Sequence, residues 1–282
     1  MHRQYSQFLE RWQRRSVTVW SVVLIVFSFD ALAGDNNGRG VKSVGMANLS
    51  NPVTADAWQM FYNPSLLSRI HGFAASVFFV PQQFGLQELR TNAFAVALPT
   101  SLGTIAASME RFGFDLYEET GVAISLGKEI EAGFSAGTTL HYVSTDIHRY
   151  GSFSAASCDI GIAYELSKSL MGSASVRRLI STTSYGHENP PILTFGFAFS
   201  FFEQSIVGLE IEKEGGFPAD LRAGLEYRIL EQLSVRVGTA NNPSKFSAGF
   251  SLHHNRLQFG FAAYSHLELG WTHQVELTWT GE

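Results

Sequence analysis

The sequence predicts an all-β fold: a transmembrane antiparallel β-barrel of about 14 strands with a short N-terminal plug segment. Segments of about ten residues recur between His71 and Thr280, and apolar side chains alternate in them with small or polar ones. The chain has only 16% charged residues but contains 23 phenylalanines and 26 glycines. After residue 33 no apolar run is long enough for a spanning helix. A closed barrel is then the structure that satisfies the backbone hydrogen bonds of such a chain in lipid.

Residues 1–33 have the pattern of a secretory signal peptide. Four arginines lie between residues 3 and 15, and Ser16–Phe29 follows without a charge. This run of about 14 residues is shorter than the roughly 20 that a spanning helix needs. Ala31-Leu32-Ala33 then has small residues at the two positions that a signal peptidase reads. We expect cleavage after Ala33 and a mature protein in the bacterial outer membrane.

Residues 34–70 are predicted to form the plug segment, centred on Ser43–Arg69, where small residues precede an aromatic patch. A short helix is expected over Asp56–Tyr62, with Thr54 as its N-cap. Proline fixes its own φ and restricts the residue before it, so Asn63-Pro64 should form the turn that leads to the first strand. The candidates for contact with the lumen are Trp58, Phe61, Tyr62, Asn63 and Pro64. The alternative is an N-terminal arm packed on another all-β domain.

Residues 71–282 are assigned to the barrel. In the clearest strand, Leu193–Phe201, phenylalanines share one face with Leu193, and small residues occupy the other. Short connections alternate with longer ones, as in barrels with short periplasmic turns and longer outer loops. Gly113–Tyr117 and Ala240–Ser244 are among the expected longer ones. The pattern predicts about fourteen strands, with about twelve as the alternative.

Two tryptophans are predicted to anchor the barrel in the membrane. Trp271 and Trp279 share one face of the last predicted strand. At ~3.3 Å per residue and a tilt of ~40°, they would lie roughly 20 Å apart along the barrel axis, close to the separation of the aromatic girdles. Outer-membrane lipid is therefore an expected partner.

Several charged residues alternate with apolar ones in the predicted strands, so their side chains should point into the lumen. They are Asp159, Glu210, Glu212, Arg222, Glu226, Arg228 and Arg236. Opposite charges on adjacent strands can pair across a sheet and stiffen it. The alternative role is a polar constriction or a cradle for the plug, and a plug contact is the role expected for Asp159.

The sequence favours neither an enzyme nor a metal or nucleic-acid site. The chain carries a net charge of −5 with its basic residues scattered, whereas nucleic-acid binding requires clustered lysine and arginine. Its histidines lack metal-ligand spacing, and isolated pairs such as Ser251 with His253 are expected to fill space in the wall. With a single cysteine, Cys158, an internal disulfide is excluded. We expect no cofactor.

Several short motifs, in their order along the chain, resemble the PorV/PorQ family within the wider FadL-like superfamily. They are Asn63-Pro64-Ser65-Leu66-Leu67, Cys158–Tyr164, Leu221–Tyr227 with Val235–Gly238, and Leu269–Val275. The resemblance implies a fourteen-stranded outer-membrane barrel with an N-terminal plug. It also implies a scaffold role in type IX-like protein secretion or surface attachment, with a secretion-machine or cargo protein as partner. The alternative is a FadL-like channel for small hydrophobic molecules.

The signal-peptide assignment predicts that protein isolated from outer membranes begins at Gly34. Mass spectrometry of the intact protein or N-terminal sequencing measures this directly. Mature material that retains residues 1–33 would remove the basis for export by this route.

Overall fold

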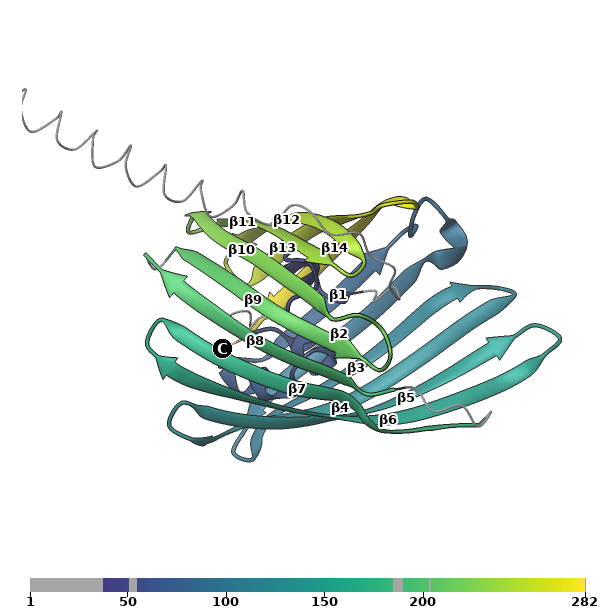
Figure 1. Ribbon diagram of the computed structural model, residues 1–282, viewed down its shortest axis with the longest axis horizontal. Helices are drawn as coiled ribbons and strands as arrows, with labels where there is room; N and C mark the ends of the chain where they lie inside the picture. Colours follow the sequence, from purple (N-terminus) through teal and green to yellow (C-terminus); the bar gives the residue numbers. More distant parts are fainter. Residues whose placement is uncertain (1–37, 51–54, 185–189, 203, 282) are drawn as a thin grey trace, which may run out of the picture. The chain divides into compact units, whose positions relative to one another are not determined.

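The computed structural model describes residues 38–50, 55–184, 190–202 and 204–281. These residues form a closed barrel of 14 antiparallel strands in which β1 pairs with β14 (Figure 1). The predicted fold class is therefore confirmed, with fourteen strands rather than the alternative of twelve. The predicted signal peptide and its cleavage site lie outside the described residues.

Each strand pairs with its neighbours in the sequence. The strands are β1 (Ala74–Val80), β2 (Thr91–Thr100), β3 (Gly103–Phe114), β4 (Tyr117–Glu131), β5 (Phe134–Ile147), β6 (Gly151–Ser167), β7 (Leu170–Thr183), β8 (Ile192–Phe201), β9 (Ser205–Glu214), β10 (Asp220–Leu230), β11 (Leu233–Asn241), β12 (Ser244–His254), β13 (Leu257–His266) and β14 (Gly270–Thr280). We call the end where β1 begins and β14 ends the inner end, and the opposite end the outer end.

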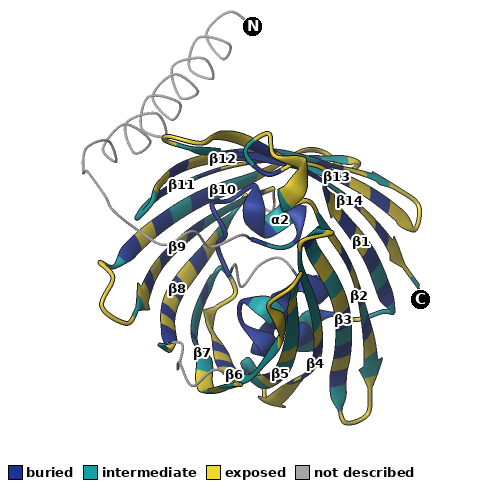
Figure 2. Ribbon diagram, turned by 90° about the vertical axis from the view of Figure 1, so that its right-hand side faces the viewer, coloured by how far each residue is buried: buried dark blue, intermediate teal, exposed yellow. Residues whose placement is uncertain are grey.

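The two faces of the wall follow the alternation in the sequence. In β8 the side chains of Phe195, Phe197 and Phe199 are exposed, whereas Thr194 and Ala198 are buried (Figure 2). Successive side chains of a strand point to opposite faces, so the phenylalanines lie outside the barrel and the small residues inside. An apolar outer face with small or polar lumen residues is the arrangement of a membrane barrel.

Two of the expected longer loops are tight turns in the structure. β3 ends at Phe114 and β4 begins at Tyr117, and β11 and β12 are separated only by Asn242 and Pro243. The first difference arises because β3 to β7 are 12 to 17 residues long, whereas β8 to β14 have 9 to 11. The long strands continue past the apolar part of the wall with residues that water can solvate, such as Asp146 and Ser152.

The N-terminal segment, defined here as residues 38–50 and 55–70, lies inside the ring of strands (Figure 2). It contains α2 (Val41–Val44) and two 3₁₀ helices, η1 (Ala57–Phe61) and η2 (Pro64–Arg69). A further 3₁₀ turn, η3 (Gln87–Leu89), lies in the connection between β1 and β2. Of the helices in the described residues, none has the length and apolar character to span a membrane.

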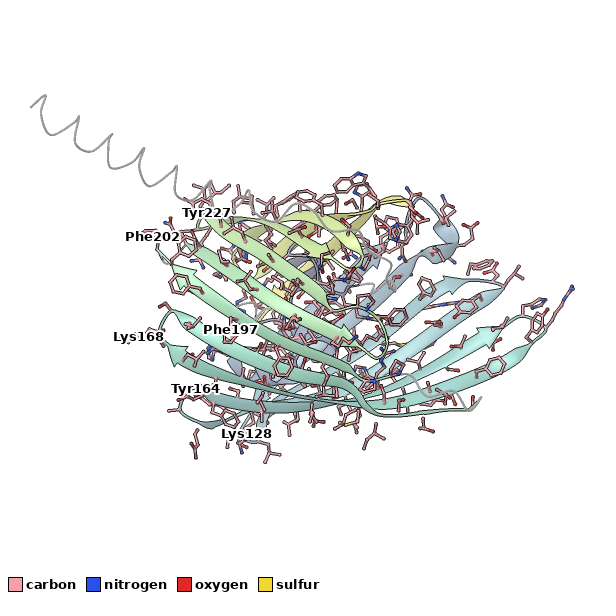
Figure 3. All side chains as sticks on the ribbon, in the orientation of Figure 1. Lys128, Tyr164, Lys168, Phe197, Phe202 and Tyr227 are labelled. Atoms are coloured by element: carbon pink, nitrogen blue, oxygen red, sulfur yellow. The ribbon has the colours of Figure 1, made fainter. Side chains whose placement is uncertain are left out.

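Aromatic and basic side chains gather on the outside near the inner end. Figure 3 labels Lys128, Tyr164, Lys168, Phe202 and Tyr227 there, with Phe197 farther along the wall. Amphipathic aromatic and basic residues are typical of the boundary between hydrocarbon and water.

The two predicted anchor tryptophans also point outward. Trp271 is 49% and Trp279 is 41% exposed, and buried residues alternate with them along β14. The structure thus places both rings on the lipid-facing side, and their role as membrane anchors stays a prediction.

Phe197→Arg should destabilise the barrel in a bilayer by about 2–4 kcal/mol, because an arginine near the middle of the hydrocarbon layer loses its hydration. Phe202→Arg is the matched control: Phe202 is 76% exposed in the turn after β8, where water can solvate the new charge. Denaturant unfolding in lipid vesicles measures both variants. Equal stability of the two would show that the assignment of the faces is wrong.

Candidate functional site

The candidate site begins with two helical turns that carry the predicted lumen residues. The carboxylate of Asp56 accepts a hydrogen bond from the backbone N–H of Trp58 at 3.1 Å, so Asp56 is the N-cap of η1. The expected N-cap was Thr54, which lies outside the described residues; an aspartate directly before the helix caps it instead. Asn63 caps η2 through Ser65, with Pro64 at the first helical position. The Asn63-Pro64 pair therefore begins a second helix as well as forming a turn.

The Asn63-Pro64 pair contacts the barrel wall at three glycines. Gly127, Gly137 and Gly161 lie opposite one another on β4, β5 and β6. A Cβ on Gly161 would lie 2.0 Å from Asn63 Oδ1, and one on Gly137 or Gly127 would lie 2.4 Å from backbone atoms of Pro64. The Asn63 amide donates to the carbonyl oxygens of two wall residues, at 3.1 and 3.3 Å. Only residues without a Cβ allow this approach.

A second glycine contact holds the part of the segment that follows α2. Gly224 and Gly238 are opposite each other on β10 and β11, and a Cβ on either would lie within 2.8 Å of Met46 or its neighbours. The backbone N–H of Ala47 donates to Ser247 Oγ at 2.7 Å. The segment is therefore held against both sides of the lumen.

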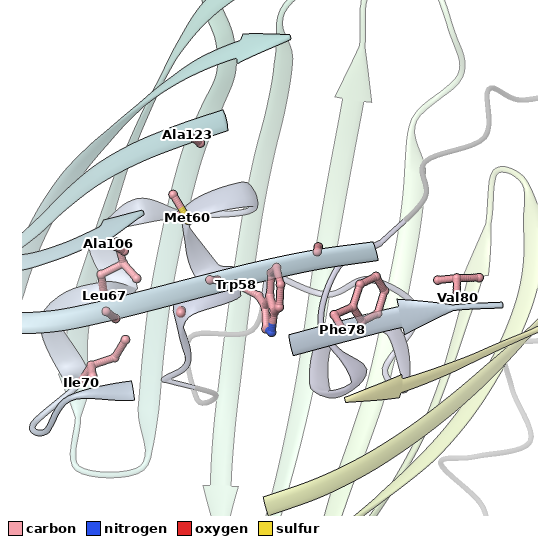
Figure 4. Packing of buried hydrophobic residues seen from close by; sticks show 12 residues of the cluster. Trp58, Met60, Leu67, Ile70, Phe78, Val80, Ala106 and Ala123 are labelled. Carbon is pink, nitrogen blue, oxygen red and sulfur yellow. The ribbon is translucent and has the colours of Figure 1, made fainter. Parts of the chain in front are cut away.

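The aromatic residues of the segment fill the space between these two contacts. Trp58 is 0% exposed and packs against Phe78 of β1, with the ring centres 5.6 Å apart (Figure 4). Around it, Met60 and Leu67 contact wall alanines on β2, β3 and β4. Small wall residues leave room for the large side chains of the segment, which accounts for the burial of these side chains.

Tyr62 joins the segment to its own beginning. Its hydroxyl accepts a hydrogen bond from the backbone N–H of Arg39 at 2.7 Å and donates to the Arg39 carbonyl at 2.9 Å. Burial raises the pKa of the Tyr62 phenol above its usual range. The phenol therefore keeps the proton that it donates.

Arg39 then links the segment to the wall. Its guanidinium donates two hydrogen bonds of 2.5 Å to the carboxylate of Glu110 on β3. The same group lies 4.7 Å above the ring of Phe61. A bidentate arginine–carboxylate pair is among the strongest of side-chain contacts, so this pair fixes the start of the segment.

Most residues of the predicted charge network meet on β9, β10 and β11. Arg222 donates to Asp220 and Glu212 at 2.6 Å, and it also pairs with Glu210 at 3.4 Å. Arg236 donates to Glu226 at 2.6 Å. Arg228 has the expected parity but lies at the exposed inner end of β10, apart from these pairs.

The charge network also reaches the N-terminal segment. Arg222 donates to the carbonyl oxygen of Asn48 at 3.2 Å, and Glu210 accepts from the backbone N–H of Ser50 at 2.9 Å. The structure thus combines the two alternatives from the sequence, since the charges pair across the strands and also contact the segment.

Asp159 has a different role from the expected plug contact. It pairs with His141 at 2.9 Å and accepts a hydrogen bond from the backbone N–H of Arg178 at 2.8 Å. Arg178 has a φ of 54°, and the pairing of β6 with β7 shifts register here. Asp159 therefore holds a β-bulge in the wall, and its partner His141 lies beside the segment, with its ring 5.5 Å from that of Phe61.

The bulge turns two consecutive arginines into the lumen. Arg177 pairs with Glu212, and Arg178 pairs with Glu214. The sequence analysis named neither arginine: strict alternation would place Arg178 outside, whereas Arg177 shares the inward parity of Ser175 and could have been predicted. Asp220 points to the same face of β10 as Arg222, so the alternation in the sequence could have predicted it as a member of the charge network.

Two cavities lie on the outer side of the segment. The larger, called the outer cavity here, has a volume of about 370 Å³ and the smaller of about 250 Å³. The outer cavity is bounded by residues near the outer ends of several strands, among them Glu110, Ile192 and Glu214. Arg39 and Glu110 line both cavities, so their ion pair stands between the two. In the described residues, no group of histidine, cysteine, aspartate or glutamate is placed to hold a metal ion.

Several solved structures share this fold. The monoaromatic hydrocarbon channel CymD aligns with a TM-score of 0.63 at 13% identity, over 87% of this chain and 98% of its own. The toluene transporter TbuX of Ralstonia pickettii aligns with a TM-score of 0.63 at 13% identity, over 86% and 97%. A FadL homologue from Pseudomonas aeruginosa aligns with a TM-score of 0.61 at 11% identity, over 86% and 98%. No protein-family model and no curated protein matches the sequence.

This chain therefore shares its barrel fold with CymD, with TbuX and with the FadL homologue. The compared proteins are named as channels, transporters and their homologues. The narrower resemblance to PorV/PorQ proteins stays a prediction.

Gly137→Ala should loosen the N-terminal segment without unfolding the barrel. The added Cβ would lie 2.4 Å from the Pro64 carbonyl carbon, and overpacking of this kind costs about 1–3 kcal/mol. Gly121→Ala is the matched control, since a Cβ there would have no neighbour nearer than 3.8 Å.

Hydrogen–deuterium exchange of residues 57–69 measures the effect. We expect faster exchange in Gly137→Ala than in Gly121→Ala, with the strands equally protected in both. Identical exchange of the segment in the two variants would contradict the glycine contact.

Proposed function

We propose that this chain is an outer-membrane channel for small molecules with an apolar part, and that its N-terminal segment keeps the channel closed. The observation that carries the proposal is the position of this segment across the lumen, fixed to the wall at both glycine contacts and by the Arg39–Glu110 pair. A protein that served only as a scaffold would not need the outer cavity, which lies directly against the N-terminal segment.

The width of the barrel supports a function that involves the lumen. Side chains fill an eight-stranded barrel, whereas barrels with about sixteen strands or more hold an aqueous channel. The wall of this barrel has mostly small inward residues, such as Ala95, Ala106 and Ser125. Without the segment the lumen would contain water from end to end, so the segment decides whether the barrel conducts.

The solved structures with this fold support the same function. CymD is a monoaromatic hydrocarbon channel, and TbuX is a toluene transporter. Their likeness concerns the fold, and the closed lumen and the cavity of this chain supply the functional argument. None of the compared proteins named here is a secretion component, so the role in protein secretion implied by the PorV/PorQ resemblance lacks comparable support.

Location in the outer membrane belongs to the same proposal. Residues 1–33 would direct export, residues 34–70 would form the plug, and residues 71–282 would form the membrane barrel. With 14 strands both ends of the barrel chain lie at the inner end, which we assign to the periplasm.

Deletion of Val44–Tyr62 should leave a folded barrel with markedly higher ion conductance in planar bilayers. The deletion removes η1 and the residues that contact Gly224 and Gly238, whereas η2 and its contacts with Gly127 and Gly137 remain, and the strand pairing is complete without the deleted residues. Heat-modifiable gel mobility provides the control that the shortened protein is still a barrel.

Two results would argue against the channel. An intact protein that already conducts like an open porin would show that the segment does not close the lumen. Closed barrels in both forms, together with loss of a bound partner protein in the deleted form, would favour the secretion role instead.

A further inference from the structure

We propose that the outer cavity binds a small amphipathic molecule whose polar end carries both a positive and a negative charge, in the manner of an amino acid with an apolar side chain. This inference rests on the proposed function and names the class of molecule that the channel would receive. It follows from the balance of charges in the cavity, from its apolar side and from its size.

Besides His141, which pairs with Asp159, the outer cavity is lined by charged side chains that are equal in number and opposite in sign. The cations are Arg39, Arg177 and Arg178, and the carboxylates are Glu110, Asp159 and Glu214. A hydrocarbon that entered would displace water from these groups and offer no hydrogen bonds in return. A molecule with only one charge would leave a charged partner in the cavity unmatched.

A zwitterionic end avoids both penalties. The Arg178–Glu214 and Arg39–Glu110 pairs keep part of their side-chain surface exposed, so a ligand can reach them. When a ligand carboxylate meets an arginine and its ammonium meets the neighbouring carboxylate, every charge retains an opposite partner. Such charge-assisted hydrogen bonds are shorter and stronger than neutral ones.

The cavity also has an apolar side for the rest of the molecule. Phe61, Val143 and Ile192 contribute to its lining. Because Arg39 lies over the Phe61 ring, the apolar and charged sides meet at this residue. A volume of about 370 Å³ is near the lower end of the ~300–1,000 Å³ typical of ligand pockets, which restricts the occupant to a small molecule.

The β-bulge in β7 shows that the charged side is a built feature of the wall. It points Arg177 and Arg178 into the same cavity, and Asp159 holds it by accepting the backbone N–H of Arg178. A regular strand would direct only one of these arginines inward. Bulges next to functional sites commonly re-aim a side chain in this way.

Four ligands with the same phenyl group separate the possibilities. They are L-phenylalanine with both charges, 3-phenylpropionate with the negative charge, phenethylamine with the positive charge and ethylbenzene with neither. Binding to the full mature protein in detergent micelles is measured by calorimetry, and micelles without protein give the background. We expect L-phenylalanine to bind about tenfold or more tightly than each of the other three, since it alone gains both ionic contacts.

Two variants test the role of the Arg178–Glu214 pair through opposite effects. Glu214→Gln leaves a surplus positive charge and should shift the preference toward 3-phenylpropionate. Arg178→Gln leaves a surplus negative charge and should shift it toward phenethylamine. Arg111→Gln is the control, because Arg111 pairs with Glu118, is 64% exposed and does not line either cavity.

Opposite shifts in the two variants, with Arg111→Gln unchanged, support the proposal, and a general loss of structure could not produce them. Ethylbenzene binding as tightly as L-phenylalanine, or the same ligand order in all variants, would overturn it. Conductance of the Val44–Tyr62 deletion is measured without ligand, so a failure of the ligand class is distinguishable from a failure of the channel itself.

Discussion

The position of the N-terminal segment in the lumen depends on its backbone contact with glycines of the wall. A segment inside a barrel must find hydrogen-bond partners for its own backbone and leave no gap beside it. Gly137 and Gly161 let Pro64 and Asn63 approach until the Asn63 amide reaches wall carbonyl oxygens. Glycine weakens a strand on its own, because it has no side chain to pack. Here residues of the segment pack against these glycines and replace the missing side chains. The glycines in turn leave the space that the segment occupies.

Buried charges fix the position of the segment more than they add stability. Arg222 and its three carboxylate partners are all nearly inaccessible to water, and taking ions out of water offsets most of their attraction. Their value lies in geometry, since Arg222 and Glu210 also bond to the backbone of Asn48 and Ser50. Any other placement of the segment would leave these bonds unmade. The apolar side chains around Trp58 fill the space inside the barrel. The ionic contacts determine the position in which the segment occupies that space.

The sequence predicted what depends on local pattern and missed what depends on distant contacts. Alternation placed Phe197 outside and Glu210 inside, because the period of a strand is a local property. Arg178 was not predicted because the bulge interrupts that period locally, and nothing in the neighbouring residues indicates the bulge. Arg39 was not predicted as a site residue, because its contact with the wall is made to Glu110, which is 71 residues away in the sequence. The glycine contacts could not be predicted from the sequence either, because only the strand register shows that Gly127, Gly137 and Gly161 lie side by side.

This chain and the compared hydrocarbon channels share the same strand arrangement in the wall. In the proposed function, the side chains that point into the lumen determine which molecule can bind there. At the level of Trp58 the interior is apolar and filled, whereas the outer cavity is charged, so a molecule from outside meets the charges first. In the proposed channel the molecule would meet Arg39 there, and Arg39 belongs to the N-terminal segment. A ligand anion that pairs with Arg39 competes with Glu110 for the same guanidinium, and Glu110 is the contact that holds Arg39 to the wall. In the proposed channel the Arg39–Glu110 pair would therefore serve both to bind the ligand and to hold the segment, so a ligand bound to Arg39 would weaken the hold of the wall on the segment.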